Sequence, residues 1–117
     1  MIKRTTLKRK CDKLFSEKVR AIGMCEFAGL DKISCGGVLQ CAHIIGRSNF
    51  NLRWDSFNAL SLCAGHHRYY TSHPFDFYEL VKSNWPDQYA YLLEHKNELW
   101  DKDYDRVLNE LSDWRPL

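Results

Sequence analysis

Apolar residues recur at the spacing of an amphipathic helix in four segments of the chain. The first covers residues 11–22, and Gly23 follows it as a stop signal. The other three follow Pro74, and two of them open with a proline, which suits the first turn of a helix. Their stripes are Phe77, Leu80, Val81 and Trp85; Tyr89, Leu92, Leu93 and Trp100; and Tyr104, Val107, Leu108, Leu111 and Trp114. The pattern predicts an N-terminal helix and a helical C-terminal extension over residues 75–117.

Between these helical segments the pattern breaks up. Residues 25–37 contain three glycines and are predicted to be a loop closed by turns. The short apolar run at residues 38–45 is β-prone and predicts a strand. A polar loop separates it from residues 57–71, which we expect to form a helix with Ser56 or Asn58 as its cap. The sequence therefore predicts an α+β fold in a single small domain.

The composition favours a domain that uses its cysteines as thiols or metal ligands. The chain has 117 residues, 44% of them hydrophobic, and a domain of this size buries only about two thirds of its unfolded surface. A metal ion would therefore help to stabilise it. Five cysteines are an odd number, which argues against a disulfide framework. With no apolar run near the roughly 20 residues of a membrane span and no signal-peptide pattern, we expect a cytoplasmic protein without a membrane partner.

Charge is distributed unevenly around a net value of +2. Residues 1–10 carry five basic and no acidic side chains, residues 11–70 carry seven and five, and residues 71–117 carry five and ten. This asymmetry favours one face for a polyanion and another for solvent or for a protein partner, self-association through the helical C-terminal region included. Residues 1–10 lack periodicity and are predicted to be a disordered basic arm, with a merely solvated tail as the alternative.

Cysteine and histidine residues occur at the spacings of a structural zinc site. Cys63 and His66 have the two-residue gap of a zinc knuckle. Cys25 and Cys35 are the preferred upstream pair, because two glycines follow Cys35 and let the chain turn tightly beside an ion. Cys41 is the alternative to Cys35, although it lies in the predicted strand, where its side chain would face the core. The alternative interpretation is that these cysteines are buried thiols that bind no metal.

A further histidine, His67, is left over once Cys63 and His66 are assigned to zinc. It follows His43 and Asn58 in the order histidine, asparagine, histidine. The segments "AHIIGR", "RWDSFNALSLC" and "CAGHH" resemble the HNH nuclease superfamily, whose ββα-metal motif has this order. The likeness is to small phage-encoded HNH proteins, including the NinG/Rap-like recombination group, and it spans residues 25–74.

The resemblance implies a phage- or prophage-derived, metal-dependent DNA endonuclease acting in the bacterial host cytoplasm, with a zinc-stapled HNH core at residues 11–74. His43 would be the general base, since a neutral imidazole suits that task near pH 7. Asn58 would hold the loop and orient the His43 ring through a hydrogen bond. His67 would bind a catalytic Mg²⁺ or Mn²⁺ ion, and His73 is a candidate second ligand.

Ala42 departs from the family's pattern, because many members have a metal-binding acid just before the first histidine. Asp55 is a candidate to compensate, with a structural role as the alternative. Arginine suits phosphate, and basic side chains flank the motif and precede it. Those predicted to contact the DNA backbone are Arg47, Arg53, Arg68, Lys3, Arg4, Lys8, Arg9 and Lys10. The intact histidine–asparagine–histidine series favours the enzyme; Ala42 favours the alternative, a non-catalytic zinc module that binds nucleic acid or protein.

Overall fold

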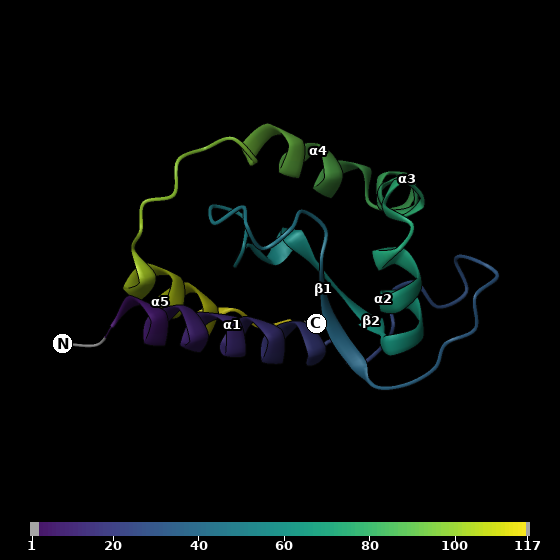
Figure 1. Ribbon diagram of the computed structural model, residues 1–117, viewed down its shortest axis with the longest axis horizontal. Helices are drawn as coiled ribbons and strands as arrows, with labels where there is room; N and C mark the ends of the chain where they lie inside the picture. The colour runs from purple at the N-terminus through teal and green to yellow at the C-terminus, as the bar shows by residue number, and fades with distance from the viewer. Residues whose placement is uncertain (1–2, 117) are drawn as a thin grey trace.

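The fold is α+β, as the sequence predicts (Figure 1). A computed structural model describes residues 3–116, in which a two-stranded antiparallel sheet is accompanied by five α-helices. The elements are α1 (Arg4–Arg20), β1 (Leu39–His43), the 3-10 helix η1 (Ser56–Asn58), β2 (Ala59–Cys63), α2 (Ala64–Thr71), α3 (Pro74–Asn84), α4 (Pro86–His95) and α5 (Tyr104–Asp113). None of the helices in residues 3–116 combines the length and the apolar character that a bilayer span needs.

The two strands form a hairpin whose register places two functional candidates at opposite ends. Leu39 lies opposite Cys63, and His43 lies opposite Ala59. β1 is the predicted strand, whereas β2 is buried along its entire length. The hairpin therefore carries His43 at the end of one strand and Cys63 at the end of the other.

The helix predicted for residues 57–71 is wrong in its first half. β2 occupies that part, and α2 begins only at Ala64. A short apolar run without alternation cannot be assigned to a buried strand or a buried helix from its period alone. The N-cap of α2 is Cys63, whose sulfur accepts the backbone N–H of a residue in the first turn, in place of the predicted Ser56 or Asn58.

Helix α1 includes most of the segment predicted to be a disordered arm. It begins at Arg4, and residues 1–2 lie outside the described residues. Cys11, Phe15 and Val19 are buried at intervals of four residues, which is the stripe of an amphipathic helix. The basic residues of the predicted arm are therefore carried on, or immediately before, a helix.

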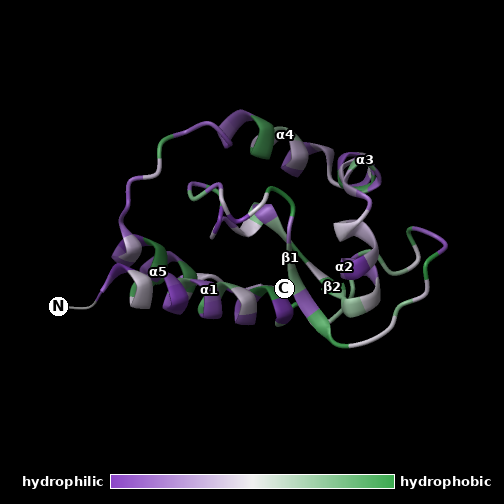
Figure 2. Cartoon of the chain, in the orientation of Figure 1, coloured by the Kyte–Doolittle hydropathy of each residue, from purple (hydrophilic) through white to green (hydrophobic). Residues whose placement is uncertain are grey.

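Helix α5 lies beside α1, although the two helices come from opposite ends of the chain (Figure 1). Val107 and Leu111 of α5 are buried in one apolar cluster with the stripe of α1. Lys18 of α1 donates a hydrogen bond from Nζ to the backbone oxygen of Trp114 at 2.8 Å. Figure 2 shows polar and apolar residues alternating along both helices, as expected where each buries one face. This packing holds α1 through Cys11, Phe15 and Val19, and residues 4–10 form the first turns of the same helix.

Helices α3 and α4 begin with prolines, as predicted, and cover a second apolar cluster that includes part of the hairpin. Phe77 and Val81 of α3 are buried there. The stripe predicted to continue from α4 to Trp100 is wrong, because α4 ends at His95. Trp100 lies instead against Trp54 in the α1–α5 cluster, with 5.3 Å between ring centroids.

The packing of α5 on α1 predicts a large effect from a single truncation. Leu111 is 4% exposed and Leu99 is 96% exposed. Leu111→Ala should lower the free energy of unfolding by about 2–5 kcal/mol, whereas Leu99→Ala should change it by less than about 0.5 kcal/mol. Urea unfolding followed by circular dichroism measures both. Equal effects from the two substitutions would contradict this packing.

Candidate metal centre and adjacent histidine pocket

The structure brings together the four ligands preferred from the sequence. Cys25 and Cys35 come from the loop between α1 and β1, Cys63 ends β2, and His66 lies in the first turn of α2. Their ligand atoms all lie within 4.8 Å of one another, so the group can hold a metal ion. Cys41, the alternative to Cys35, does not belong to the group. Three thiols and one imidazole are a donor set typical of structural zinc sites.

The contacts within the group show which atoms face the metal position. His66 Nδ1 lies 3.1 Å from the sulfur of Cys63, 3.6 Å from that of Cys25 and 3.7 Å from that of Cys35. The Cys63 sulfur also accepts the backbone N–H groups of Gly36 and His66, each at 3.4 Å. Burial works to raise the pKa of Cys63, but these donors outweigh it and lower the pKa to about 6. The thiolate, which is the metal-binding form, is thereby favoured.

A glycine is required where the ligand loop meets α2. Gly37 has a φ angle of +83°, a conformation that favours glycine. A Cβ atom at this position would lie 2.8 Å from the Cβ of Ala64, at the start of α2. The close approach places the loop that carries Cys35 beside the helix that carries His66.

Asp31 is a component of the centre that the sequence analysis missed. Its Oδ1 lies 3.0 Å from His66 Nε2, and its Oδ2 accepts the hydroxyl of Tyr70. A third bond, from the backbone N–H of Ile33, fixes the carboxylate. A metal-binding histidine commonly donates its second N–H to a carboxylate, which orients the ring. Asp31 therefore directs His66 Nδ1 toward the three sulfurs. In the sequence, the only indication of this role is that Asp31 lies between the two ligands Cys25 and Cys35.

A second site lies next to the candidate metal centre and includes both predicted catalytic histidines. His43 and His67 line one pocket of about 400 Å³, together with Asp12, Ser16, Cys41 and Arg47. His66 and His67 are consecutive on α2, so their side chains project about 100° apart. One turn of helix thereby supplies a ligand to the metal centre and an imidazole to the pocket.

The hydrogen bonds of the two pocket histidines define what each ring can do. His43 Nε2 lies 2.8 Å from the backbone oxygen of Arg53, and because a carbonyl oxygen only accepts, Nε2 carries the proton. Nδ1 of His43 then has a lone pair. His67 Nδ1 lies 2.7 Å from Gln40 Oε1, which directs its Nε2 away from that contact. Burial lowers the pKa of both imidazoles, so the neutral form predominates at pH 7.

Asn58 holds the connection between the strands but does not contact the His43 ring. Its Nδ2 donates to the backbone oxygens of Ile45 and Leu52, at 2.9 and 3.0 Å, and its Oδ1 accepts the N–H of Ile45 at 2.7 Å. The predicted hydrogen bond from Asn58 to His43 is therefore wrong. The carbonyl of Arg53 orients the ring instead, and Asn58 acts on it only through the loop.

Arg53 is not available for the predicted contact with DNA. Its guanidinium is buried and bonded to both carboxylate oxygens of Asp12, at 2.9 and 2.8 Å. Asp12 also accepts the indole N–H of Trp54 at 2.9 Å. The pair joins α1 to the loop whose carbonyl orients His43. Asp12, which the sequence analysis missed, is the acid that lines the histidine pocket.

Two other candidates lie away from the histidine pocket. Asp55, considered as a substitute for the acid missing at Ala42, caps η1 and accepts the hydroxyl of Tyr91 at 2.6 Å. His73 is exposed, stacks on Tyr69 with 4.0 Å between ring centroids, and bonds to the backbone oxygen of that residue. Neither residue is among those that line the pocket.

The remaining basic candidates differ in exposure. Arg47 lines the pocket and Arg68 is exposed on α2. Those on or before α1 are exposed except for Lys8, which is half-buried: Lys3, Arg4, Lys8, Arg9 and Lys10.

Comparison of the chain with profiles of known protein families, with curated proteins and with solved structures finds no match.

The composition of the centre predicts which cysteine is needed for metal binding. Cys35→Ser should reduce the metal content of the purified protein to well below one ion per chain, because it removes a ligand. Cys41→Ser is the matched control and should leave the content unchanged, because Cys41 lies in the pocket. Elemental analysis of both variants, purified without added metal, makes the comparison. Metal loss in the Cys41 variant alone would contradict the assignment.

The contact between Asp31 and His66 predicts a weaker but measurable effect on affinity. Asp31→Asn removes the charge that orients the imidazole, and loss of such a partner typically weakens metal binding about 10–100-fold. Asp113→Asn, an exposed carboxylate at the end of α5, is the control and should bind as tightly as the parent. Competition with a chromophoric chelator measures the affinities. Unchanged affinity in the Asp31 variant would show that the carboxylate is not coupled to the metal.

Proposed function

We propose that this protein is a metal-dependent endonuclease of the HNH type that hydrolyses phosphodiester bonds in DNA. Its Cys25–Cys35–Cys63–His66 group would hold a structural zinc ion. The observation that carries the proposal is the convergence of His43 and His67 in one pocket beside Arg47. The strand–strand–helix order of β1, β2 and α2 and the role of Asn58 in the connecting loop add support, because the resemblance implies both.

The hydrogen bonds assign a separate task to each side chain. His43, protonated on Nε2 by its bond to the Arg53 carbonyl, would accept the proton of the attacking water at Nδ1. Arg47 would bind a non-bridging oxygen of the phosphate, for which a guanidinium fork is suited. Attack forms a new P–O bond and breaks the one to the leaving deoxyribose oxygen.

A divalent ion would complete this chemistry. Mg²⁺ or Mn²⁺ bound at His67 would supply positive charge beside the phosphate. His67 fits this role because its Nδ1 is bonded to Gln40. Its other ring nitrogen, Nε2, is then the atom that would bind the ion. The sources of the other ligands would be water and the phosphate itself.

A second function, a zinc module that binds nucleic acid or protein without cutting, is favoured by one observation. In residues 3–116, the Cys25 group is the one place where three or more histidine, cysteine or acidic ligand atoms converge. The acid in the histidine pocket, Asp12, is bonded to Arg53. Binding of DNA without cleavage under any divalent metal would support this alternative.

The role assigned to His43 predicts a loss of rate without loss of structure. His43→Ala removes the proton acceptor and should slow nicking of supercoiled plasmid by about 10²–10⁴-fold, with metal content and DNA affinity near those of the parent. His95→Ala, a half-buried histidine on α4 paired with Glu98, is the matched control and should cut at the parental rate. Assays with Mg²⁺, Mn²⁺ or EDTA establish the metal requirement.

The pH dependence supplies an independent measure of the same group. Because burial lowers the pKa of His43 below 6.5, the base is neutral above that pH and becomes protonated only as the pH falls through the lowered pKa. The nicking rate should therefore hold down to pH 6.5 and fall below it. Equal rates for the His43 variant and the parent, or an acid limb centred above pH 6.5, would contradict the assignment of the base.

A further inference from the structure

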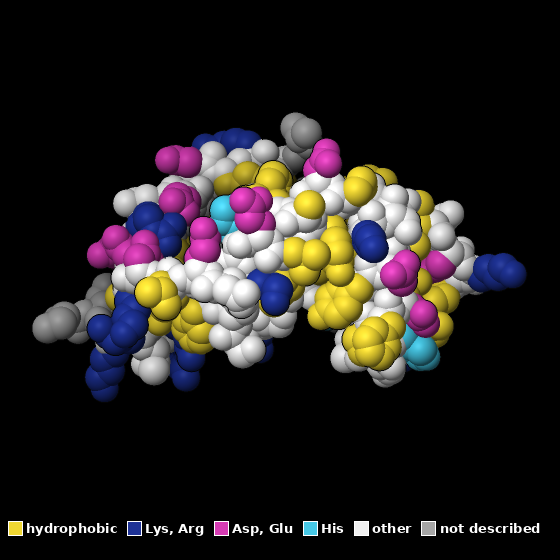
Figure 3. All heavy atoms as spheres, turned by 90° about the horizontal axis from the view of Figure 1, so that it is seen from above, with side chains coloured by type: hydrophobic (Ala, Val, Ile, Leu, Met, Phe, Trp, Pro, Cys, Tyr) yellow, Lys and Arg dark blue, Asp and Glu magenta, His cyan; other side chains and the backbone are white. Residues whose placement is uncertain are grey.

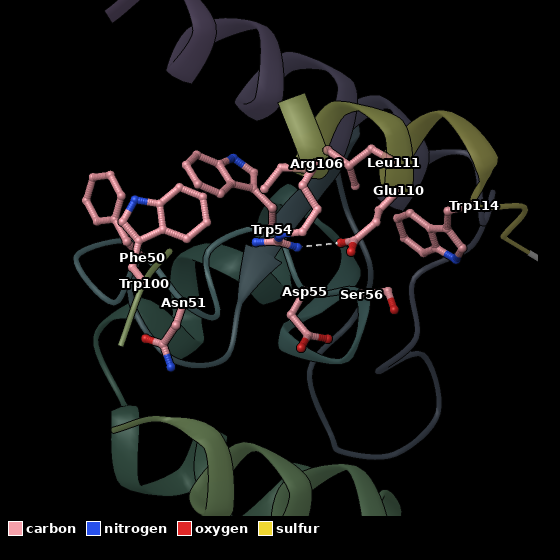
Figure 4. A pocket seen from close by; sticks show the side chains of 11 residues that line it. Phe50, Asn51, Trp54, Asp55, Ser56, Trp100, Arg106, Glu110, Leu111 and Trp114 are labelled. Atoms are coloured by element: carbon pink, nitrogen blue, oxygen red, sulfur yellow. Dashed lines mark hydrogen bonds and ion pairs between the residues drawn. The ribbon is translucent and has the colours of Figure 1, made fainter. Parts of the chain in front are cut away.

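A second cavity lies between the loop that follows β1 and helix α5, away from the histidine pocket. It has a volume of about 270 Å³, and its walls combine aromatic rings with carboxylates (Figure 4). Three of the four tryptophans of the chain line it: Trp54, Trp100 and Trp114. Figure 4 shows Phe50, Trp100 and Trp54 toward one end and Trp114 toward the other, with Arg106, Glu110 and Asp55 between them.

The charge of this cavity is negative. Its lining includes two carboxylates, Asp55 and Glu110, and one guanidinium, Arg106. Arg106 is bonded to Glu110 at 2.8 Å and also to a third acid, Asp101, at 2.6 and 3.0 Å. The single positive charge of Arg106 is therefore outweighed by the two negative charges bonded to it. Asp55 forms no ion pair within residues 3–116, and its oxygens accept neutral donors from Phe57 and Tyr91.

The aromatic wall already contacts a cation of the chain itself. The guanidinium carbon of Arg106 lies 5.7 Å from the centroid of the Trp100 ring, within the range of a cation–π contact. Tryptophan faces next to carboxylates are suited to arginine, lysine and other organic cations. The C-terminal segment that supplies Trp100 and α5 is itself acidic, because residues 71–117 carry ten acidic and five basic side chains. Figure 3 shows several acidic groups on the same half of the molecule as α5.

From this combination we infer that the cavity is a binding site for a basic side chain, arginine above all, presented by a partner protein. The negative lining disfavours the phosphate backbone of a nucleic acid. A guanidinium that enters the cavity would lie among its tryptophan rings and pair with Asp55. This site does not depend on the proposed nuclease activity, since it shares no residue with the histidine pocket.

Tryptophan fluorescence of the whole protein tests the inference. The probes are the peptide acetyl-Gly-Arg-Gly-amide and its citrulline counterpart, which has nearly the same shape without the charge. The arginine peptide should give a saturable change in fluorescence, because three tryptophans line the cavity, and the citrulline peptide should bind about tenfold more weakly. Equal affinity for the two peptides, or no saturable signal, would overturn the inference.

A pair of double variants locates the binding. Asp55→Asn/Glu110→Gln removes both carboxylates of the lining and should weaken the arginine peptide about tenfold or more. Glu79→Gln/Glu94→Gln removes two exposed carboxylates from α3 and α4 and should leave the affinity unchanged. Equal weakening in both variants would mean a general charge effect and overturn the site. A single-stranded oligonucleotide that binds the parent but not the Asp55/Glu110 variant would overturn the class of ligand.

Discussion

The convergence of Cys25, Cys35, Cys63 and His66 joins three separate parts of the chain: the loop between α1 and β1, the end of β2 and the first turn of α2. The loop between α1 and β1 has no strand or helix of its own, and Cys35 and the glycines that follow it are exposed. Besides the burial of Phe27 in the apolar cluster of α3 and α4, the loop is held by the ligand group, the Asp31–His66 contact and a pair of bonds between Glu26 and Ser61 of β2. In small sites of this kind the free energy of metal binding is largely free energy of folding.

The candidate active site lies next to this metal centre. His66 Nδ1 lies next to the three sulfurs of the candidate metal centre, and the next residue of α2, His67, lines the pocket that His43 also lines from the end of β1. Asp12 of α1 also lines this pocket, and its pair with Arg53 ties α1 to the carbonyl that orients His43. The N-terminal helix is thus part of the pocket, and a basic segment that resembles a tail becomes part of a helix with a defined position.

Local patterns predicted the features that depend on local physics. Rules that act over a few residues are enough to predict three features. These are the first residues of α3 and α4 at Pro74 and Pro86, the apolar stripe of α5, and the spacing of Cys63 and His66. The failures involve contacts between distant segments. Helix α1 packs against α5, and β2 is buried on both faces. Arg53 pairs with Asp12, which lies 41 positions earlier in the chain. No single-sequence pattern distinguishes an arginine bound to phosphate from one bound to a buried carboxylate.

X-ray absorption at the zinc edge of the purified protein tests the metal centre most directly, because it reports the atoms around the ion. Three sulfur neighbours at about 2.3 Å and one nitrogen neighbour at about 2.0 Å are expected. Four sulfur neighbours would mean that another cysteine replaces His66. A shell of nitrogen and oxygen alone, or no zinc in the folded protein, would contradict the Cys25–Cys35–Cys63–His66 centre.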